Sequence, residues 1–198
     1  MDGTRIVHDG CGGTTTRGLN MQVTSGKPFW PLDPDPRDVS IRDIARALSM
    51  TCRYGGHVKA FYSVAQHSIE LSKLVHVEHR LAALLHDASE AYVGDLIRPI
   101  KLMLPEFVEI EKRVERAVAE RFHLPDLCPP EVKDADTRIV ANEMRDLLAE
   151  PDGVDWGRLP LPFPELPRGH FAVPLSPLDA EREFLNRYTA LSGDTTWM

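Results

Sequence analysis

Cysteine is scarce in this chain, and nothing in the spacing of its cysteines pairs them. The three present, Cys11, Cys52 and Cys128, are an odd number, lie far apart and form no Cys-x-x-Cys motif. A disulfide framework and a thiolate zinc site are therefore excluded, and a reducing compartment is favoured.

Long apolar runs and an excess of positive charge are missing as well. No apolar stretch reaches the roughly 18–20 residues that span a bilayer, and the opening Met-Asp-Gly-Thr lacks the basic and apolar blocks of a signal peptide. We therefore expect a cytoplasmic protein with no membrane partner. The 23 Lys+Arg against 30 Asp+Glu give a net charge of −7, which opposes binding of long nucleic acids. A small anionic substrate would need local cations or a metal.

The length of 198 residues fits one domain. Residues 1–20 are rich in Gly and Thr and show no apolar period, so we expect a disordered leader there and a single domain over 21–198. Met21 is a candidate for the true start, because the patterned sequence begins near it.

Apolar residues recur at the three- to four-residue spacing of amphipathic helices, and no segment alternates as a strand does. The expected fold class is all-α, a bundle of about six helices. Ser63 is expected to begin a capping box in which Gln66 reaches back to the Ser63 amide. The expected helices begin after Ser40 and Ser63, run over 78–92, begin at Pro105, run over about 130–148 and, after a proline-rich loop at 151–175, run from Ser176-Pro177 to about Leu191.

Four side chains stand out for their chemistry: His67, the adjacent pair His86–Asp87, and Asp136. Imidazole nitrogen and carboxylate oxygen are ligands of divalent transition metals, and helical bundles build such sites from facing helices. The pair ends the most apolar helix, where burial without partners would cost several kcal/mol. A single histidine is more often a satisfied core or surface residue, however, so periodicity alone leaves the metal-site and the structural interpretations open.

The order of these residues resembles the H…HD…D signature of the HD-domain metal-dependent phosphohydrolases. Residues 86–101 read His-Asp-Ala-Ser-Glu-Ala-Tyr-Val-Gly-Asp-Leu-Ile-Arg-Pro-Ile-Lys and resemble the bacterial 5′-deoxynucleotidase branch more specifically. Residues 52–68 contain Cys-Arg-Tyr-Gly-Gly-His and Tyr-Ser-Val-Ala-Gln-His-Ser, which are similar to phage and prophage members of that branch. The resemblance spans roughly residues 21–192.

The resemblance implies a role for each matching residue. Glu90 and Asp95 match the two acids that flank and activate the attacking water, and Arg53 matches the arginine that binds the substrate phosphate. Tyr54 stands where the best-studied members carry a tryptophan that packs on the sugar, and Lys101 is a further candidate phosphate contact. The implied metal ligands are His67, His86, Asp87 and Asp136.

The activity that the resemblance implies is removal of phosphate from 2′-deoxynucleoside 5′-monophosphates. It implies one divalent transition metal per subunit (Mn, Co, Fe, Ni or Zn) and a homo-oligomer. A two-metal phosphodiesterase of this superfamily needs additional histidines between the His-Asp pair and the last aspartate. His123 is the only histidine between Asp87 and Asp136, which argues against that activity. One alternative is a deoxynucleoside triphosphate hydrolase, for example a dATP-clearing phage-type enzyme. Another is a non-catalytic metal- or nucleotide-binding sensor, which would need neither Glu90 nor Asp95.

Overall fold

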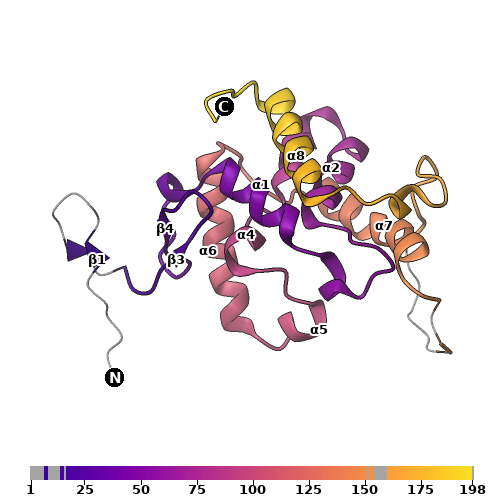
Figure 1. Ribbon diagram of the computed structural model, residues 1–198, viewed down its shortest axis with the longest axis horizontal. Coiled ribbons are helices and arrows are strands. Elements are labelled where there is room, and N and C mark those ends of the chain that lie inside the picture. Colours follow the sequence, from indigo (N-terminus) through magenta and orange to yellow (C-terminus); the bar gives the residue numbers. More distant parts are fainter. Residues whose placement is uncertain (1–6, 9–13, 16, 151, 154–159, 198) are drawn as a thin grey trace.

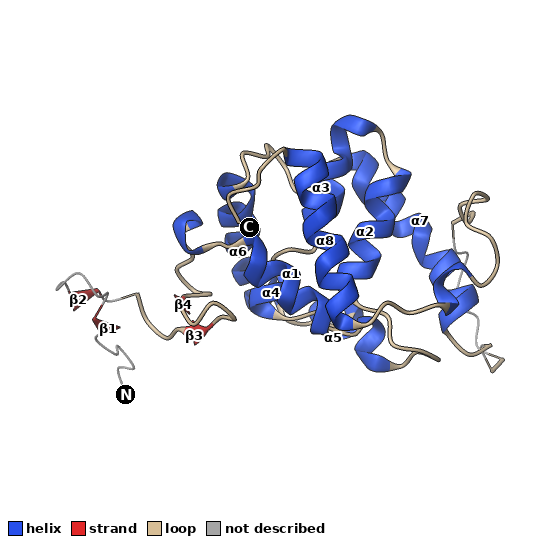
Figure 2. Ribbon diagram, turned by 45° about the horizontal axis from the view of Figure 1, so that its top comes forward, coloured by secondary structure: helices blue, strands red, loops and turns tan. Residues whose placement is uncertain are grey.

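The computed structural model describes residues 7–8, 14–15, 17–150, 152–153 and 160–197, and within them α-helices dominate (Figures 1 and 2). The fold class is all-α, as the sequence predicts. Six of the helices have six residues or more, whereas α4 and α5 are single turns. The helices are α1 (Ile41–Met50), α2 (Val64–Leu74), α3 (Arg80–Leu85), α4 (Glu90–Val93), α5 (Arg98–Lys101), α6 (Pro105–Arg121), α7 (Pro130–Leu147) and α8 (Pro177–Ser192), with 3-10 turns η1 (Pro36–Asp38), η2 (Arg53–Gly56), η3 (Val77–His79) and η4 (His170–Ala172).

Two short antiparallel hairpins precede the helices. They pair β1 (Val7–His8) with β2 (Thr14–Thr15) and β3 (Met21–Gln22) with β4 (Pro28–Phe29). Residues 1–6, 9–13 and 16 of the expected leader lie outside the described residues, so the division into a disordered leader and a domain over 21–198 stays a prediction. Arg17 forms ion pairs with Asp33 and Asp38.

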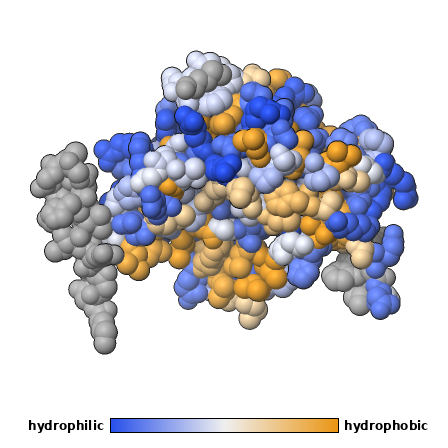
Figure 3. All heavy atoms as spheres, in the orientation of Figure 1, coloured by the Kyte–Doolittle hydropathy of each residue, from blue (hydrophilic) through white to orange (hydrophobic). Residues whose placement is uncertain are grey.

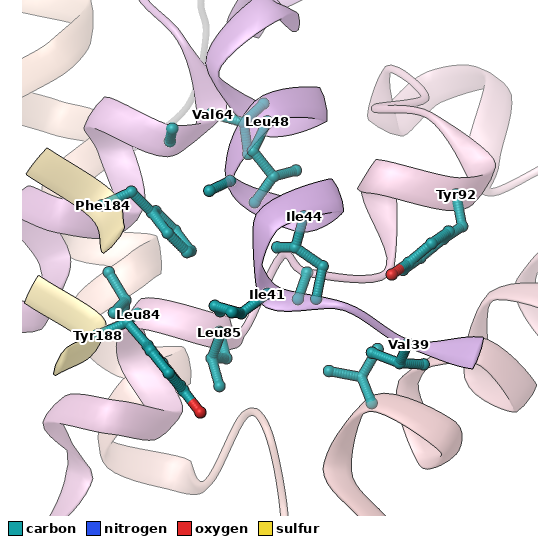
Figure 4. Close-up of a cluster of buried hydrophobic side chains, with 14 of the residues drawn as sticks. Val39, Ile41, Ile44, Leu48, Val64, Leu84, Leu85, Tyr92, Phe184 and Tyr188 are labelled. Atoms are coloured by element: carbon teal, nitrogen blue, oxygen red, sulfur yellow. The ribbon is translucent and has the colours of Figure 1, made fainter. Parts of the chain in front are cut away.

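The main core lies where α8 packs across α1, α2 and α3 (Figure 4). Ile44 and Leu48 of α1 and Phe184 of α8 belong to this cluster, and all three side chains are fully buried. Their spacing is that of one helix face, which is why the sequence predicts α1 and α8 correctly. This core fixes α2 and α3, which carry the two histidines of interest.

A second core joins α2 to α7. Leu71 of α2 and Ile139 and Leu147 of α7 are buried together with Tyr62 and Phe171. The predicted limits of α7 are confirmed to within one residue. Its buried face includes two polar residues, Asn142 and Glu143, whereas the apolar Val140 and Met144 are only half-buried.

The predicted helix over 78–92 is wrong as a continuous element. The chain forms η3, then α3, then a turn over residues 86–89, then α4. In that turn the amides of Ala88, Glu90 and Ala91 bond to carbonyls three residues back rather than four. Such tightening rotates successive side chains differently from an α-helix, and here it occurs at the His86–Asp87 pair.

The capping box at Ser63 is half right. The Ser63 hydroxyl accepts a hydrogen bond from the Gln66 amide, at 3.1 Å. The Gln66 side chain does not reach back: it accepts from the Leu175 amide and donates to the Val173 carbonyl. It therefore anchors the segment before α8 to α2. No helix in the described ranges is long and apolar enough to cross a bilayer.

We expect Leu48→Ala to lower the free energy of unfolding by about 2–5 kcal/mol, because it removes a fully buried side chain from the main core. The measurement is urea denaturation of the full chain with chelator present. Leu178→Ala is the matched control, since Leu178 is 66% exposed on α8. Equal effects of the two substitutions would contradict the packing described.

Candidate functional site

The two histidines of the predicted cluster face each other in the interior. His67 lies on α2 and is fully buried, and His86 lies in the turn after α3 and is nearly so. Their Nε2 atoms are 3.4 Å apart. The His67 Nδ1 is 2.6 Å from a Glu143 oxygen, and the His86 Nδ1 donates to the Ala83 carbonyl at 2.8 Å. Since carboxylate and carbonyl oxygens only accept, each Nδ1 carries a proton, and Nε2 is the nitrogen of each ring that faces the cluster.

The two aspartates complete the cluster. Asp87 Oδ2 is 3.1 Å from the His86 Nε2 and 3.8 Å from the His67 Nε2. Asp136 Oδ1, from α7, is 3.1 Å from the His67 Nε2 and 3.8 Å from the His86 Nε2. The exposed fraction of the side chain is 19% for Asp87 and 36% for Asp136, whereas both histidines are almost completely buried. The cluster therefore opens to solvent on the aspartate side.

Charges in the cluster favour a cation at its centre. Burial and Arg53 lower the pKa of His67, but Glu143 and Asp136 outweigh them and hold it above its ordinary value. Burial also lowers the pKa of His86, and Asp87 and Asp136 raise it well above the ordinary value. The carboxylates around the two rings therefore stabilise positive charge at this point, whether a proton or a metal ion carries it.

Glu90 and Asp95 lie near the cluster, close enough for the charge of Asp87 to act on both. Glu90 begins α4, one turn after His86, and its Oε2 is buried with no hydrogen-bond partner in the described part of the chain. Burial, with repulsion from Asp87 and Asp95, raises the pKa of Glu90 well above its ordinary value. Burial and Asp87 likewise raise the pKa of Asp95, which follows Gly94 in a loop. A carboxylate with a raised pKa and an oxygen that has no hydrogen-bond partner is suited to accepting a proton.

Arg53 and Tyr54 lie in η2, a turn that reaches the cluster from outside the helices. The Arg53 guanidinium is 3.3 Å from Asp87 Oδ2 and 3.5 Å from Glu143 Oε2. Tyr54 has φ of 57° and Gly55 has φ of 59°, both in the left-handed region. A bulky residue is rarely found there, and such conformations concentrate at functional sites. The structure thus brings both residues to the cluster.

Lys101, the remaining predicted substrate contact, forms an ion pair with Glu111 of α6, a side chain that is almost fully buried. Glu90 also acts on this ammonium and contributes to raising its pKa, after Glu111. Lys101 is therefore near the acidic side of the cluster but already engaged. Its role toward substrate stays a prediction.

Sequence reasoning missed Glu143. This residue is fully buried, and its carboxylate contacts His67, Tyr54 and Tyr62. Burial would raise the pKa of Glu143, but Arg53 and His67 lower it to about 2. One feature of the sequence could have indicated it. Glu143 follows Asp136 by seven residues, which places both on the same face of one helix, two turns apart.

Comparison with known proteins gives concordant matches. The model of the YfbR-like 5′-deoxynucleotidase family matches residues 57–154. The Escherichia coli K12 protein YfdR, named as uncharacterized, is 39% identical over 173 residues, covering 87% of this chain and 95% of that protein. A Rhodobacter capsulatus protein, also named as uncharacterized, is 39% identical over 124 residues, 58% of this chain and 63% of that one. A Vibrio cholerae 5′-deoxynucleotidase is 43% identical over 54 residues, 27% of each chain.

The family match covers His67, the turn with His86 and Asp87, and Asp136, and the YfdR match extends over most of the chain. The all-α fold and the histidine–aspartate cluster agree with both. The chain therefore belongs to the YfbR-like 5′-deoxynucleotidase family of HD-domain phosphohydrolases.

Proposed function

We propose that this protein is a metal-dependent phosphohydrolase that removes phosphate from 2′-deoxynucleoside 5′-monophosphates. The observation that carries the proposal is the convergence of two imidazole nitrogens and two carboxylate oxygens beside the unpartnered carboxylate of Glu90. A cluster built only for stability would not leave a buried carboxylate oxygen without a partner.

The residues fit one divalent transition metal. Ligand atoms that share an ion at about 2.0–2.2 Å lie about 3–4.4 Å apart, depending on the angle between them at the ion, and each histidine Nε2 here lies 3.1–3.8 Å from the other three candidate atoms. Mixed nitrogen and oxygen donors suit Mn, Co, Fe, Ni or Zn. The four that would hold it are His67, His86, Asp87 and Asp136.

When bound, the ion supplies Lewis acidity, which draws charge from phosphate oxygens and makes water more acidic. Glu90 accepts the proton of the attacking water, and Asp95 orients that water. Arg53 neutralises charge on the phosphate with its planar guanidinium, and the ring of Tyr54 packs on the sugar. The water oxygen bonds to phosphorus, the bond to the 5′ oxygen breaks, and that oxygen takes up a proton. The products are a nucleoside and inorganic phosphate.

The test is phosphate release from a panel of deoxy- and ribonucleoside mono- and triphosphates, with Mn²⁺ or Co²⁺ and with chelator, with products identified by chromatography. We expect inorganic phosphate from deoxynucleoside monophosphates, abolished by chelator. Turnover of triphosphates alone would replace the proposal with a deoxynucleoside triphosphate hydrolase. Metal binding without any turnover would favour a sensor.

The metal is expected to stabilise the fold. An ion that binds only the folded chain adds about 2.7 kcal/mol when its concentration is 100 times Kd. Because the pKa values of His67 and His86 are raised, protons compete for the same atoms, so this gain grows as the pH rises through neutrality. The measurement is the shift in Tm on adding Mn²⁺ or Co²⁺ at several pH values. His86→Ala is expected to lose the shift, and His76→Ala, exposed on the surface, to keep it. An equal shift in both would contradict the ligand assignment.

Glu90→Gln is expected to lower kcat by about 10²–10⁴-fold, because the amide cannot take the proton, while the metal-induced shift in Tm remains. Glu78→Gln is the matched control, since its side chain is 69% exposed in η3. If Glu90→Gln keeps most of the wild-type activity, the role given to Glu90 is wrong.

We also propose that the chain is a cytoplasmic homo-oligomer, as the family resemblance implies. Supporting this, residues 97–106 are exposed or half-buried and mostly apolar, and Figure 3 shows hydrophobic side chains along the lower edge, where Figure 1 places α5. Arg98 and Glu106 lie at opposite ends of this segment, so an antiparallel two-fold contact would pair each with the other's copy. We expect Leu102→Asp with Met103→Asp to yield monomer in sedimentation equilibrium. Leu161→Asp, at a site 82% exposed, should leave the wild-type mass unchanged; a monomeric wild type would overturn the proposal.

A further inference from the structure

Glu143 is a carboxylate that none of the steps above uses. It lies on α7, and both its side chain and that of His67 are inaccessible to solvent. Its Oε1 accepts from the His67 Nδ1 at 2.6 Å. An ionised carboxylate in the interior is retained only where several groups compensate it, so its neighbours define what it does.

Two of those neighbours, Arg53 and Tyr54, come from the η2 turn, and the third, Tyr62, lies just before α2. The Tyr54 hydroxyl donates to Oε2 at 2.6 Å, and the Tyr62 hydroxyl donates to Oε1 at 3.0 Å. The Arg53 Nε lies 3.5 Å from Oε2. One oxygen of Glu143 therefore faces a candidate metal ligand, and the other faces the two residues expected to touch substrate.

The Oε1 side determines the state of His67. A carboxylate accepts hydrogen bonds only, so His67 must hold a proton on Nδ1, and in its neutral form it presents the Nε2 lone pair to the cluster. Partners of this kind fix the tautomer and the ring orientation of a metal-ligating histidine, and their loss commonly weakens metal binding by 10–100-fold.

The Oε2 side holds a strained turn. Tyr54 adopts a left-handed backbone conformation without being glycine, next to Gly55 in the same region. The turn is held at its base by the Arg53 amide, which donates to the Tyr62 carbonyl at 2.9 Å. At its tip, the bond from the Tyr54 hydroxyl to Glu143 ties the aromatic ring to α7. The Tyr54 hydroxyl is thereby engaged, and the ring is held beside the Arg53 guanidinium, which lies 5.6 Å from the ring centroid.

We propose that Glu143 is a positioning residue that aligns His67 with the metal and, through its second oxygen, holds the Arg53–Tyr54 turn against the same site. The proposal rests on the proposed function, because it assumes that the cluster binds a metal. It adds that metal affinity and substrate binding depend on opposite oxygens of one buried side chain.

The first experiment measures metal affinity alone, by competition of Mn²⁺ and Co²⁺ with a chelating dye, on the full chain. Glu143→Gln is expected to bind 10–100-fold more weakly than wild type, and Glu143→Asp, which keeps the charge, to fall between them. Glu150→Gln is the matched control, an exposed glutamate just beyond α7, and is expected to be unchanged. Unchanged affinity in a natively folded Glu143→Gln, judged by circular dichroism, would overturn the proposal. A wild type that binds neither ion would overturn the proposed function itself and is recognised separately.

The second experiment separates the two oxygens and does not depend on how Glu143 variants fold. Tyr54→Phe keeps the ring and removes only the bond to Oε2. We expect metal affinity within about twofold of wild type, because Oε1 still orients His67, with KM for the hydrolysed deoxynucleotide raised several-fold and kcat little changed. An unchanged KM would show that the turn does not depend on Glu143 and would overturn that half of the proposal.

Discussion

The fold has to hold two aspartates against two facing histidines, and the remaining structure follows from that constraint. Each histidine Nε2 lies 3.1–3.8 Å from the other three candidate ligand atoms, which come from α2, α7 and the turn after α3. No single helix can bring them together. The core between α1 and α8 fixes α2 and α3, and the second core fixes α7 against α2. Packing far from the site therefore sets the distances within it.

Concentrating so many acids would be unfavourable without compensation. Arg53 lies between Asp87 and Glu143, two tyrosine hydroxyls and the His67 Nδ1 satisfy Glu143, and Lys101 pairs with Glu111 at the outer side. Glu90 is the exception, with one buried oxygen unpartnered. Cations and hydrogen-bond donors therefore compensate the acids that hold other groups in position. Glu90, the acid proposed to take a proton, keeps one oxygen without such a partner.

The sequence predicts the framework well where periodicity is strong. The beginnings of α1, α2, α6, α7 and α8 follow from capping serines, prolines and apolar spacing. It fails at the His86–Asp87 pair, because an apolar run cannot show that backbone bonds tighten there from four residues to three. It also fails at Glu143, whose burial depends on Tyr54 and Tyr62, distant in sequence and brought near only by the fold. The ligand set came from motif resemblance, since spacing alone left a structural histidine equally open.

The most direct test of the account is a crystal structure of the Mn²⁺- or Co²⁺-loaded protein with anomalous scattering recorded at the metal edge. The account predicts one ion per chain, bonded to Nε2 of His67 and of His86 and to a carboxylate oxygen of Asp87 and of Asp136. Glu90 should lie near the ion without bonding to it. An ion held by other side chains, a second ion in the cluster, or a cluster that stays empty at saturating metal would contradict it.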